Sequence, residues 1–337
     1  MSASLPAENL YLDLSARAKL RLTGADRVRF LNGQVSNDMR RVSDDVSIYT
    51  GVMTIKGKLC ADAFVHAAGD SLLMDAEPEL RDSLLPRLER YVIADDVQID
   101  DATEDFGLLH LLIFADAPDT ALPDPLATLG PDVQAVRSWR YGREGLDLFY
   151  PAGQSAEVRA SIHAAGFTLL NDDGLESLRI TAGVPRWGAE LTPDTMPAEA
   201  GIEERAVSFA KGCYIGQEVV SRVKSVGHAN RLLCGLRALD ASPLYPGMKL
   251  LPDTAATDAP AADATAGTPA PARPVGEITS AAPAAGHGGA HYLALALVRR
   301  TSATPGTRLL ALVPADPADA SASVPPCPVE ICALPFA

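Results

Sequence analysis

Residues 47–75 alternate apolar and polar side chains in short runs between tight turns, and this pattern constrains the fold more than any other feature. Turns are expected at Lys56-Gly57-Lys58 and Ala68-Gly69-Asp70. The alternation between them is clearest at four apolar positions: Leu59, Ala61, Ala63 and Val65. A period of two is typical of a strand with one buried face, and turns this short join antiparallel neighbours. The segment therefore predicts three antiparallel strands.

Helical patterns are interspersed with these strands. Residues 78–92 carry an apolar stripe at helical spacing, and further helices are expected at 27–33, 158–165 and 175–182. From Arg231 onward the pattern contains only short strands separated by turn residues, which indicates a small terminal barrel. The fold class is therefore predicted as α+β.

The length of 337 residues suggests more than one domain. We expect residues 1–240 to form an α+β region of two interleaved subdomains, one of which includes roughly residues 47–100. Residues 241–337 would form the C-terminal β-barrel. Within it, residues 252–274 are rich in Ala and Pro, with almost nothing to bury, and predict a mobile insertion.

Composition excludes several classes of function. A formal net charge of −14 argues against direct nucleic-acid binding, which depends on Lys and Arg contacts to phosphates. The N-terminus lacks the pattern of a secretory signal, and no apolar stretch is long enough to cross a bilayer, so we expect a cytoplasmic protein without a membrane partner. The five scattered cysteines form no Cys-x-x-Cys pair, which favours reduced thiols and no metal site.

The octapeptide Lys211-Gly212-Cys213-Tyr214-Ile215-Gly216-Gln217-Glu218 places one thiol in an unusual setting. A helix is expected directly after Gly216, because valines recur there at helical spacing. The ammonium of Lys211 and the N-terminal end of that helix would both favour the thiolate of Cys213. The alternative is a small buried hydrophobe in a turn.

Other polar residues are candidates for ligand contacts, and each has a structural alternative. Asp62 could hydrogen-bond a ring nitrogen or an amine, or it could face solvent. The loop that ends at Asp147 could form a pocket wall or only a hairpin turn. Trp187 could stack on a flat ligand or cover the core. Glu199 could belong only to a turn that leads to the octapeptide.

The helix after Gly216 adds two further candidates. Glu218 could serve the site or cap the helix, and Arg222 could meet the glutamate tail or phosphate of an anionic ligand or be solvated. His228 follows this helix and would partner Cys213 in a thiol hydrolase. The helix separates the two residues at about 1.5 Å per residue, which disfavours that pairing.

These segments together resemble the YgfZ-type folate-binding proteins, relatives of the glycine-cleavage T-protein, an aminomethyltransferase. The octapeptide at 211–218 is similar to the signature of that family without a mismatch. The resemblance extends over most of the chain and omits the Ala/Pro-rich insertion and the extreme ends. The other segments that carry it are 22–38, 177–185, 197–201 and 276–280.

The resemblance implies a three-domain T-protein-like architecture with the C-terminal barrel, arranged around a central folate site. It implies tetrahydrofolate or a one-carbon derivative as cofactor, and iron-sulfur assembly or client proteins as partners. The implied role is to support biogenesis or repair of iron-sulfur enzymes, and indirectly tRNA modification. The catalytic residues would be Cys213, Lys211 and Asp62. The expected folate contacts are Asp62, Asp147, Arg179, Trp187, Glu199, Tyr214, Gln217, Glu218 and Arg222.

Two departures from the aminomethyltransferases bear on activity. The strand after the glycine turn keeps one carboxylate, Asp62, where those enzymes resemble Gly-Gly-x-x-Asp-Asp. Residues 174–179 lack an arginine of the pattern Ala-Arg-Asp-x-Leu-Arg. We therefore expect folate binding without aminomethyl transfer. The alternative is an active folate-dependent one-carbon transferase, in which Glu144 or Asp147 replaces the missing carboxylate.

Overall fold

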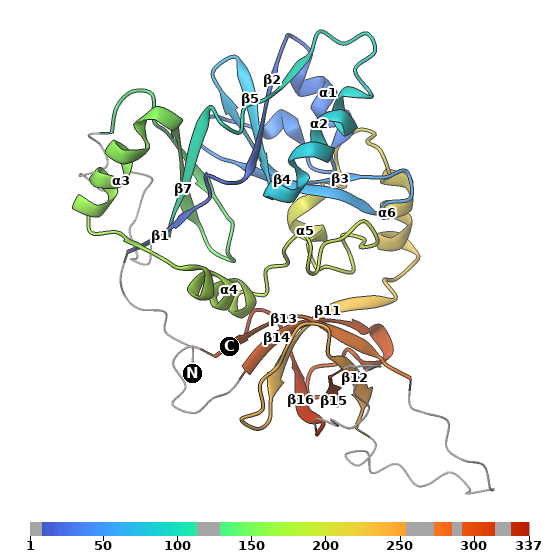
Figure 1. Ribbon diagram of the computed structural model, residues 1–337. Coiled ribbons are helices and arrows are strands. Elements are labelled where there is room, and N and C mark those ends of the chain that lie inside the picture. The colour runs from blue at the N-terminus through green and yellow to red at the C-terminus, as the bar shows by residue number, and fades with distance from the viewer. Residues whose placement is uncertain (1–8, 113–128, 254–272, 285–291, 314–324, 337) are drawn as a thin grey trace, which may run out of the picture.

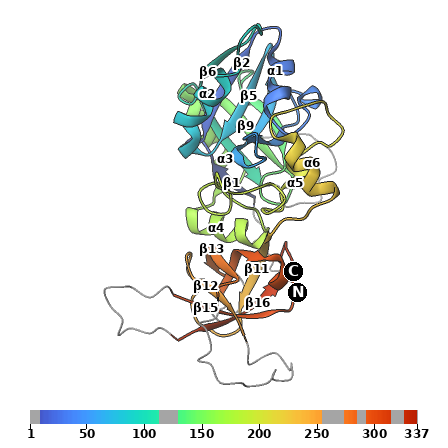
Figure 2. The ribbon, with the colours of Figure 1, turned by 90° about the vertical axis from the view of Figure 1, so that its right-hand side faces the viewer.

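The computed structural model describes residues 9–112, 129–253, 273–284, 292–313 and 325–336. Two five-stranded sheets with their helices lie above a closed six-stranded barrel in Figure 1, and the view turned by 90° shows the same two tiers (Figure 2). The α+β class and the T-protein-like architecture with a C-terminal barrel are confirmed by this arrangement and by a solved structure of the same fold, given below.

The first sheet has the order β10-β1-β7-β9-β8, and only the β10–β1 pairing is parallel. Its strands are β1 (Leu10–Asp13), β7 (Phe106–Leu112), β8 (Gln134–Ser138), β9 (Gly145–Pro151) and β10 (Thr168–Leu169). The chain leaves this sheet after β1, builds the whole second sheet, and returns at β7. The two sheets are therefore interleaved in sequence.

The second sheet has the order β3-β4-β5-β2-β6 and is antiparallel throughout. Its strands are β2 (Ala18–Thr23), β3 (Ile48–Met53), β4 (Leu59–Ala68), β5 (Ser71–Ala76) and β6 (Gln98–Asp101). The alternating residues of β4 divide between its two faces. Leu59, Ala61, Ala63 and Val65 pack in one hydrophobic core with residues of α1 and α2. On the other face, the ring of Phe64 lies against the guanidinium of Arg140, which follows β8, and His66 contacts Phe149 of β9.

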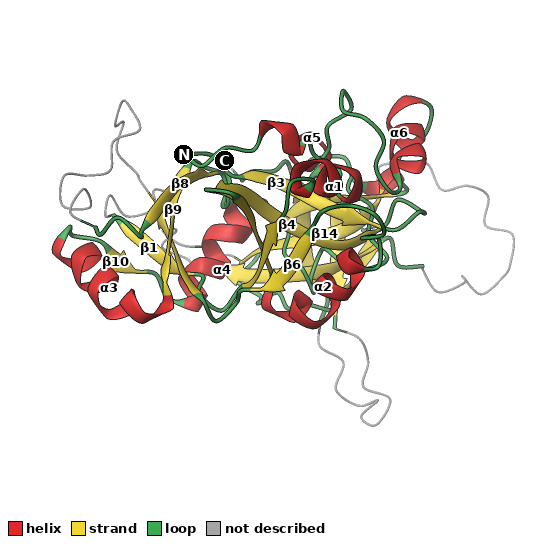
Figure 3. Cartoon of the chain, turned by 90° about the horizontal axis from the view of Figure 1, so that it is seen from above, coloured by secondary structure: helices red, strands yellow, loops and turns green. Residues whose placement is uncertain are grey.

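Helices are short, and no helix of the described residues is long and apolar enough to cross a bilayer. Figure 3 shows the helices from above, mostly at the periphery of the sheets. The α-helices are α1 (Arg27–Gln34), α2 (Arg81–Glu89), α3 (Ser155–Ala164), α4 (Asp172–Thr181), α5 (Glu203–Ala206) and α6 (Gln217–Ser225). Single 3-10 turns are η1 (Met39–Arg41), η2 (Pro78–Leu80), η4 (Ala152–Gln154) and η5 (Arg300–Ser302).

The barrel closes in the order β11-β14-β13-β12-β15-β16. Its strands are β11 (Arg231–Ala238), β12 (Lys249–Pro252), β13 (Gly276–Pro283), β14 (Tyr292–Arg299), β15 (Arg308–Leu312) and β16 (Cys327–Cys332). The strand-only pattern expected from Arg231 onward corresponds to this barrel, because alternate residues of β11 fill its interior before the predicted domain boundary at 240. Most of the Ala/Pro-rich insertion, residues 254–272, lies outside the described residues.

The facing surfaces of the two sheets meet through buried charges. The guanidinium of Arg140, just after β8, donates to Asp75 of the second sheet (2.8 and 3.0 Å) and to Asp147 of the first (2.9 and 3.0 Å). Nδ1–H of His110 completes the set with a 2.7 Å bond to Asp147. All four side chains are almost fully buried. Burial alone would raise the pKa of both aspartates, but the guanidinium of Arg140 that they share lowers it below the usual value.

A second set of polar contacts joins α4 to the barrel. Arg179 donates to Glu190 (3.0 Å) and to the hydroxyl of Ser280 on β13 (2.6 Å). The Ser280 hydroxyl in turn donates to Glu190 (2.5 Å), and Ser177 donates to the carbonyl of Pro283 (3.4 Å). These directional contacts hold the helix on the barrel, and Figure 1 shows α4 directly above the barrel strands.

Replacement of Arg140 by methionine should strongly destabilise the protein. The change would leave Asp75 and Asp147 buried without their shared cation, which costs about 3–5 kcal/mol in the free energy of unfolding. Urea denaturation would measure this loss. Arg81→Met is the matched control, because Arg81 makes only exposed pairs with Asp101 and Glu104, typically worth less than about 1 kcal/mol. Equal losses in the two variants would contradict the assignment.

Candidate functional site

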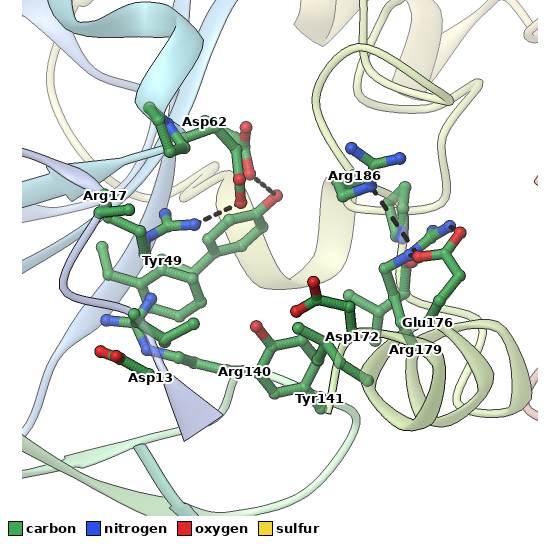
Figure 4. A pocket seen from close by; sticks show the side chains of 18 of the residues that line it. Asp13, Arg17, Tyr49, Asp62, Arg140, Tyr141, Asp172, Glu176, Arg179 and Arg186 are labelled. Carbon is green, nitrogen blue, oxygen red and sulfur yellow. Dashed lines mark hydrogen bonds and ion pairs between the residues drawn. The ribbon is translucent and has the colours of Figure 1, made fainter. Parts of the chain in front are cut away.

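A cavity of about 460 Å³ lies where the two sheets and α4 meet. We call it the main cavity. Its size falls within the usual range of about 300–1,000 Å³ for small-molecule sites. Figure 4 shows side chains that point into it from both sheets and from α4. Residues that line it and enter the argument below are Asp13, Arg17, Tyr49, Asp62, Phe64, Glu77, Arg140, Tyr141, Asp172, Asp173, Glu176, Arg179, Arg186 and Arg205.

Asp62 is the polar residue of this lining that most clearly lacks a full set of partners. Its Oδ2 accepts a hydrogen bond from the Tyr49 hydroxyl at 3.0 Å, whereas its Oδ1 is buried and has no partner among the described residues. Burial raises the pKa of this carboxyl to about 6, and the neighbouring Arg17 only partly offsets that shift. Near neutral pH the group can therefore donate or accept a proton.

Glu77 brings a second carboxylate to the same wall. Arg17 donates to Glu77 and, at 2.5 Å, to Asp75, so one guanidinium serves two carboxylates. Glu77 also contributes repulsion that raises the pKa of Asp62. Because Ala63 pairs with Ala76 in the β4–β5 hairpin, Asp62 and Glu77 follow at the next register position. The wall thus carries a carboxyl pair with too little positive charge to neutralise it.

The structure brings two of the predicted site residues, Asp62 and Arg179, to the main cavity. Asp147 does not line the cavity; it is buried and accepts hydrogen bonds from Arg140 and His110. Glu199 pairs with Arg231 at 3.2 Å, outside the lining. Glu144, proposed as an alternative acid, is exposed and lies 4.0 Å from Arg137. Neither Glu144 nor Asp147 lines the main cavity, whereas Glu77 does.

Two aromatic candidates are core residues. Trp187 and Tyr214 are more than nine-tenths buried and belong to the hydrophobic core around the second sheet. Burial raises the pKa of the Tyr214 hydroxyl to about 12, and this hydroxyl has no hydrogen-bond partner among the described residues. The alternative that Trp187 covers the core describes its position, and a stacking role would require it to leave that core.

Comparison with known proteins gives the relationship. No family model matches the chain. An aminomethyltransferase of Shouchella clausii is 27% identical over 254 residues, which are 68% of this chain and 67% of that protein. A tRNA-modifying protein YgfZ of Yersinia pseudotuberculosis is 29% identical over 244 residues, 69% of this chain and 71% of that protein. The chain is thus homologous to the YgfZ-type proteins and to the aminomethyltransferases.

Two further comparisons define the extent of this relationship. A chloroplastic protein of Arabidopsis thaliana, named as a transferase, is 25% identical over 72% of this chain, and the match spans 59% of its own length. The glycine cleavage system aminomethyltransferase T of Bartonella henselae superposes with a TM-score of 0.77 at 17% identity, over 98% of this chain and 86% of that one. The latter comparison shows that the aminomethyltransferase fold is present.

The YgfZ-type octapeptide lies outside the lining of the main cavity. The ammonium of Lys211 is buried and donates to three main-chain carbonyls, those of Asn32, Val35 and Asn37, at 2.6–2.7 Å. The ammonium therefore holds together the carbonyl groups at the end of α1 and just after it, and it is not directed at the thiol. Burial lowers the pKa of Lys211 to about 8. Cys213 is exposed.

The backbone of the octapeptide explains one of its glycines. Gly216 has a φ of +87°, and a Cβ there would lie 2.5 Å from the carbonyl oxygen of Thr54. Gly212 has neither constraint. The helix α6 begins at Gln217, as expected, with Gly216 as its N-cap, so Cys213 lies three residues before the cap. The effect of this helix end on the thiol stays a prediction.

Three predicted folate contacts lie on α6, and two of them face solvent. Glu218 and Arg222 pair with each other at 2.6 Å across one turn, and both are mostly exposed. Gln217 is half-buried at the start of the helix. None of these three residues lines the main cavity. Their roles in cofactor binding remain predictions, and the solvated alternative for Arg222 fits its position.

Sequence reasoning missed several residues of the site: Arg17, Tyr49, Glu77, Arg140 and Arg205. Tyr141 begins the loop that was predicted as a possible pocket wall, and it lines the cavity. One signal could have found Glu77. The turn at Gly69-Asp70 leaves only two residues between β4 and β5, and a hairpin of that length fixes which residues face each other. No comparable local signal exists for Arg205, which reaches the cavity from α5, far along the chain.

Asp62→Asn and Asp147→Asn should change stability in opposite directions at about pH 7.5. The raised pKa of Asp62 means that its ionisation destabilises the folded state increasingly as the pH rises from about 4 to 6. Asp62→Asn should therefore raise the free energy of unfolding by about 2–3 kcal/mol, and this gain should vanish near pH 4. Asp147, whose pKa is lowered, stabilises the fold above its ordinary pKa, and this contribution is lost as the pH falls.

Urea denaturation of the ligand-free protein across this pH range would measure both effects. Asp147→Asn should lower the free energy of unfolding at about pH 7.5. A loss of stability in both variants would show that Asp62 is compensated in the folded protein.

Proposed function

We propose that the protein binds tetrahydrofolate, or a one-carbon derivative of it, in the main cavity. The observation that carries this proposal is the carboxyl group of Asp62, which lines a cavity of ligand size in an aminomethyltransferase fold and whose buried Oδ1 has no partner among the described residues. A buried carboxyl oxygen without a partner costs free energy unless a ligand satisfies it.

The residues of the lining fit a pterin-type ligand. A pterin presents N–H donors and ring nitrogens, and the carboxyl of Asp62, with a pKa of about 6, can accept from the former or donate to the latter. Tyr49, Phe64 and Tyr141 supply aromatic surface for a flat ring. When bound, the folate would supply the one-carbon chemistry, and the chain would orient it through Asp62 and Tyr49.

We further infer that the protein is a cytoplasmic accessory factor that supports biogenesis or repair of iron-sulfur enzymes, and through them tRNA modification. The relatives named as tRNA-modifying proteins support the last part. Cys213 is its functional thiol. The exposure of Cys213, outside the lining of the main cavity, suits contact with a protein partner better than contact with the bound ligand.

An alternative function is a folate-dependent one-carbon transferase. One observation favours it: Glu77 and Asp62 together provide two carboxyl groups on the cavity wall, with Asp62 able to exchange a proton near neutral pH. Tetrahydrofolate-dependent transfer from an aminomethyl or methylene donor that is lost in both Asp62→Ala and Glu77→Gln would select this function over the accessory role.

Calorimetric titration with tetrahydrofolate tests the ligand. The wild-type protein should bind saturably, and Asp62→Ala should weaken binding by about tenfold or more, because a hydrogen bond to a buried carboxyl is lost. Glu144→Gln, which changes an exposed carboxylate outside the lining, is the matched control and should bind as wild type. Absence of saturable binding at high micromolar ligand would refute the folate assignment.

Complementation tests the role of Cys213. In a bacterium that lacks its own YgfZ-type protein, the wild-type chain should restore the activity of an iron-sulfur enzyme and the tRNA modification that depends on it. Cys213→Ala should fold and bind tetrahydrofolate but fail to restore either readout. Cys60→Ala, at a half-buried position on β4, is the control. Full rescue by Cys213→Ala would remove the thiol from the proposal.

A further inference from the structure

The arginines that line the main cavity differ in how their charge is neutralised. Four of them have a carboxylate within 4.0 Å: Arg17, Arg140, Arg179 and Arg186. Arg205 has no carboxylate partner within the described ranges. Its guanidinium donates only to the carbonyl of Trp139 and lies over the ring of Tyr49, 5.3 Å from the centroid. It is therefore a partly buried cation whose neutralising anion is absent from this part of the chain.

Arg205 lies at the edge of the main cavity. Tyr49, over which it lies, donates a hydrogen bond to Asp62. Burial lowers the pKa of Arg205, so the local structure disfavours its charge and does not compensate it. Of the acids beside it on α5, Glu203 lies 3.9 Å from Lys224, and Glu204 is exposed. Neither of them forms an ion pair with Arg205.

Arg205 also lines a second hollow, of about 480 Å³, on the other side of Tyr49 and Phe64. These three residues are common to the linings of both spaces. The second hollow contains one more cation, Arg41, which is exposed and has no carboxylate partner in the described segments either. Its other notable residues are Trp139, which is 51% exposed, and Glu204.

We propose that Arg205 binds a carboxylate of the ligand that occupies the main cavity, and that the second hollow takes the rest of an anionic tail, with Arg41 as its next cation. This inference rests on the proposed function. It specifies the ligand as a reduced pterin with a glutamyl or oligoglutamyl chain. The guanidinium of Arg205 can engage a carboxylate in a bidentate manner without giving up a competing ion pair.

The opposite side of the main cavity is unsuited to an anionic tail. Asp172, Asp173 and Glu176 of α4 line it there, and Figure 4 shows the carboxylate of Asp172 directed into the open space. The cations on that side, Arg179 and Arg186, already lie 2.5 and 4.0 Å from the carboxylate of Glu176. Like charges would repel a carboxylate that leaves the cavity past α4. The distribution of charge therefore directs the tail past Arg205.

Three ligands distinguish this inference from the proposed function itself. They are 6-methyltetrahydropterin, which has no tail and is measured as a competitor, tetrahydrofolate with one glutamate, and tetrahydrofolate pentaglutamate. Each would be titrated calorimetrically into wild-type protein, Arg205→Met, Arg205→Lys and Arg41→Met. Arg237→Met is the matched control, because Arg237 pairs with Glu330 on the barrel and lines neither space.

We expect Arg205→Met to lose about tenfold or more in affinity for both glutamylated ligands, the loss typical of a hydrogen bond to a charged group. Its affinity for the methylpterin should equal that of wild type, which also shows that the variant is folded. Arg205→Lys should recover part of the loss. Arg41→Met should weaken only the pentaglutamate, and Arg237→Met should change nothing.

Other results would overturn the inference. Wild-type affinity of Arg205→Met for tetrahydrofolate would show that no carboxylate binds there. An equal loss for all three ligands would show that Arg205 acts on the pterin through Tyr49 and not on the tail. If the wild-type protein binds none of the three, the folate assignment fails and this inference fails with it.

Discussion

Neutralisation of buried charge is the constraint on which the rest of the structure depends. The facing surfaces of the two sheets place three carboxylates, those of Asp75, Asp147 and Glu77, against two guanidiniums, those of Arg17 and Arg140. Buried carboxylates without cations are costly, so each guanidinium is shared and its position is fixed. Contacts of this kind are directional, unlike apolar packing, and they set how the two sheets are placed beside the cavity.

This arrangement explains why Asp62 has no cation of its own. Arg17 is the cation nearest to it, but Arg17 already serves Asp75 and Glu77. Asp62 therefore keeps a raised pKa and an unpartnered oxygen, and the folded protein is less stable for it. Residues that cost stability in this way concentrate at functional sites, because selection retains them only where a ligand or a reaction needs them.

Local patterns in the sequence were sufficient for the elements but not for the site. The period of two at 59–65 was sufficient to predict β4 and its buried face. The length of the hairpin that follows would also have predicted that Asp62 lies opposite Glu77. In contrast, the proximity of Lys211 to Cys213 in sequence suggested an electrostatic effect that the structure does not support, because carbonyls near residue 35 bind the ammonium. Sequence proximity cannot show which of several neighbours a long side chain reaches, nor that Arg205 lies beside Tyr49.

The position of α4 has a mechanical consequence. One face of the helix lines the main cavity through Asp172, Leu175 and Glu176, while Arg179 and Ser177 hold the same helix on the barrel strand β13. Because α4 is held on the barrel and also forms one side of the main cavity, a displacement of the barrel is transmitted to the cavity. Any tilt of the barrel must therefore widen or narrow the space beneath the sheets, and a ligand that fills this space must resist such a tilt.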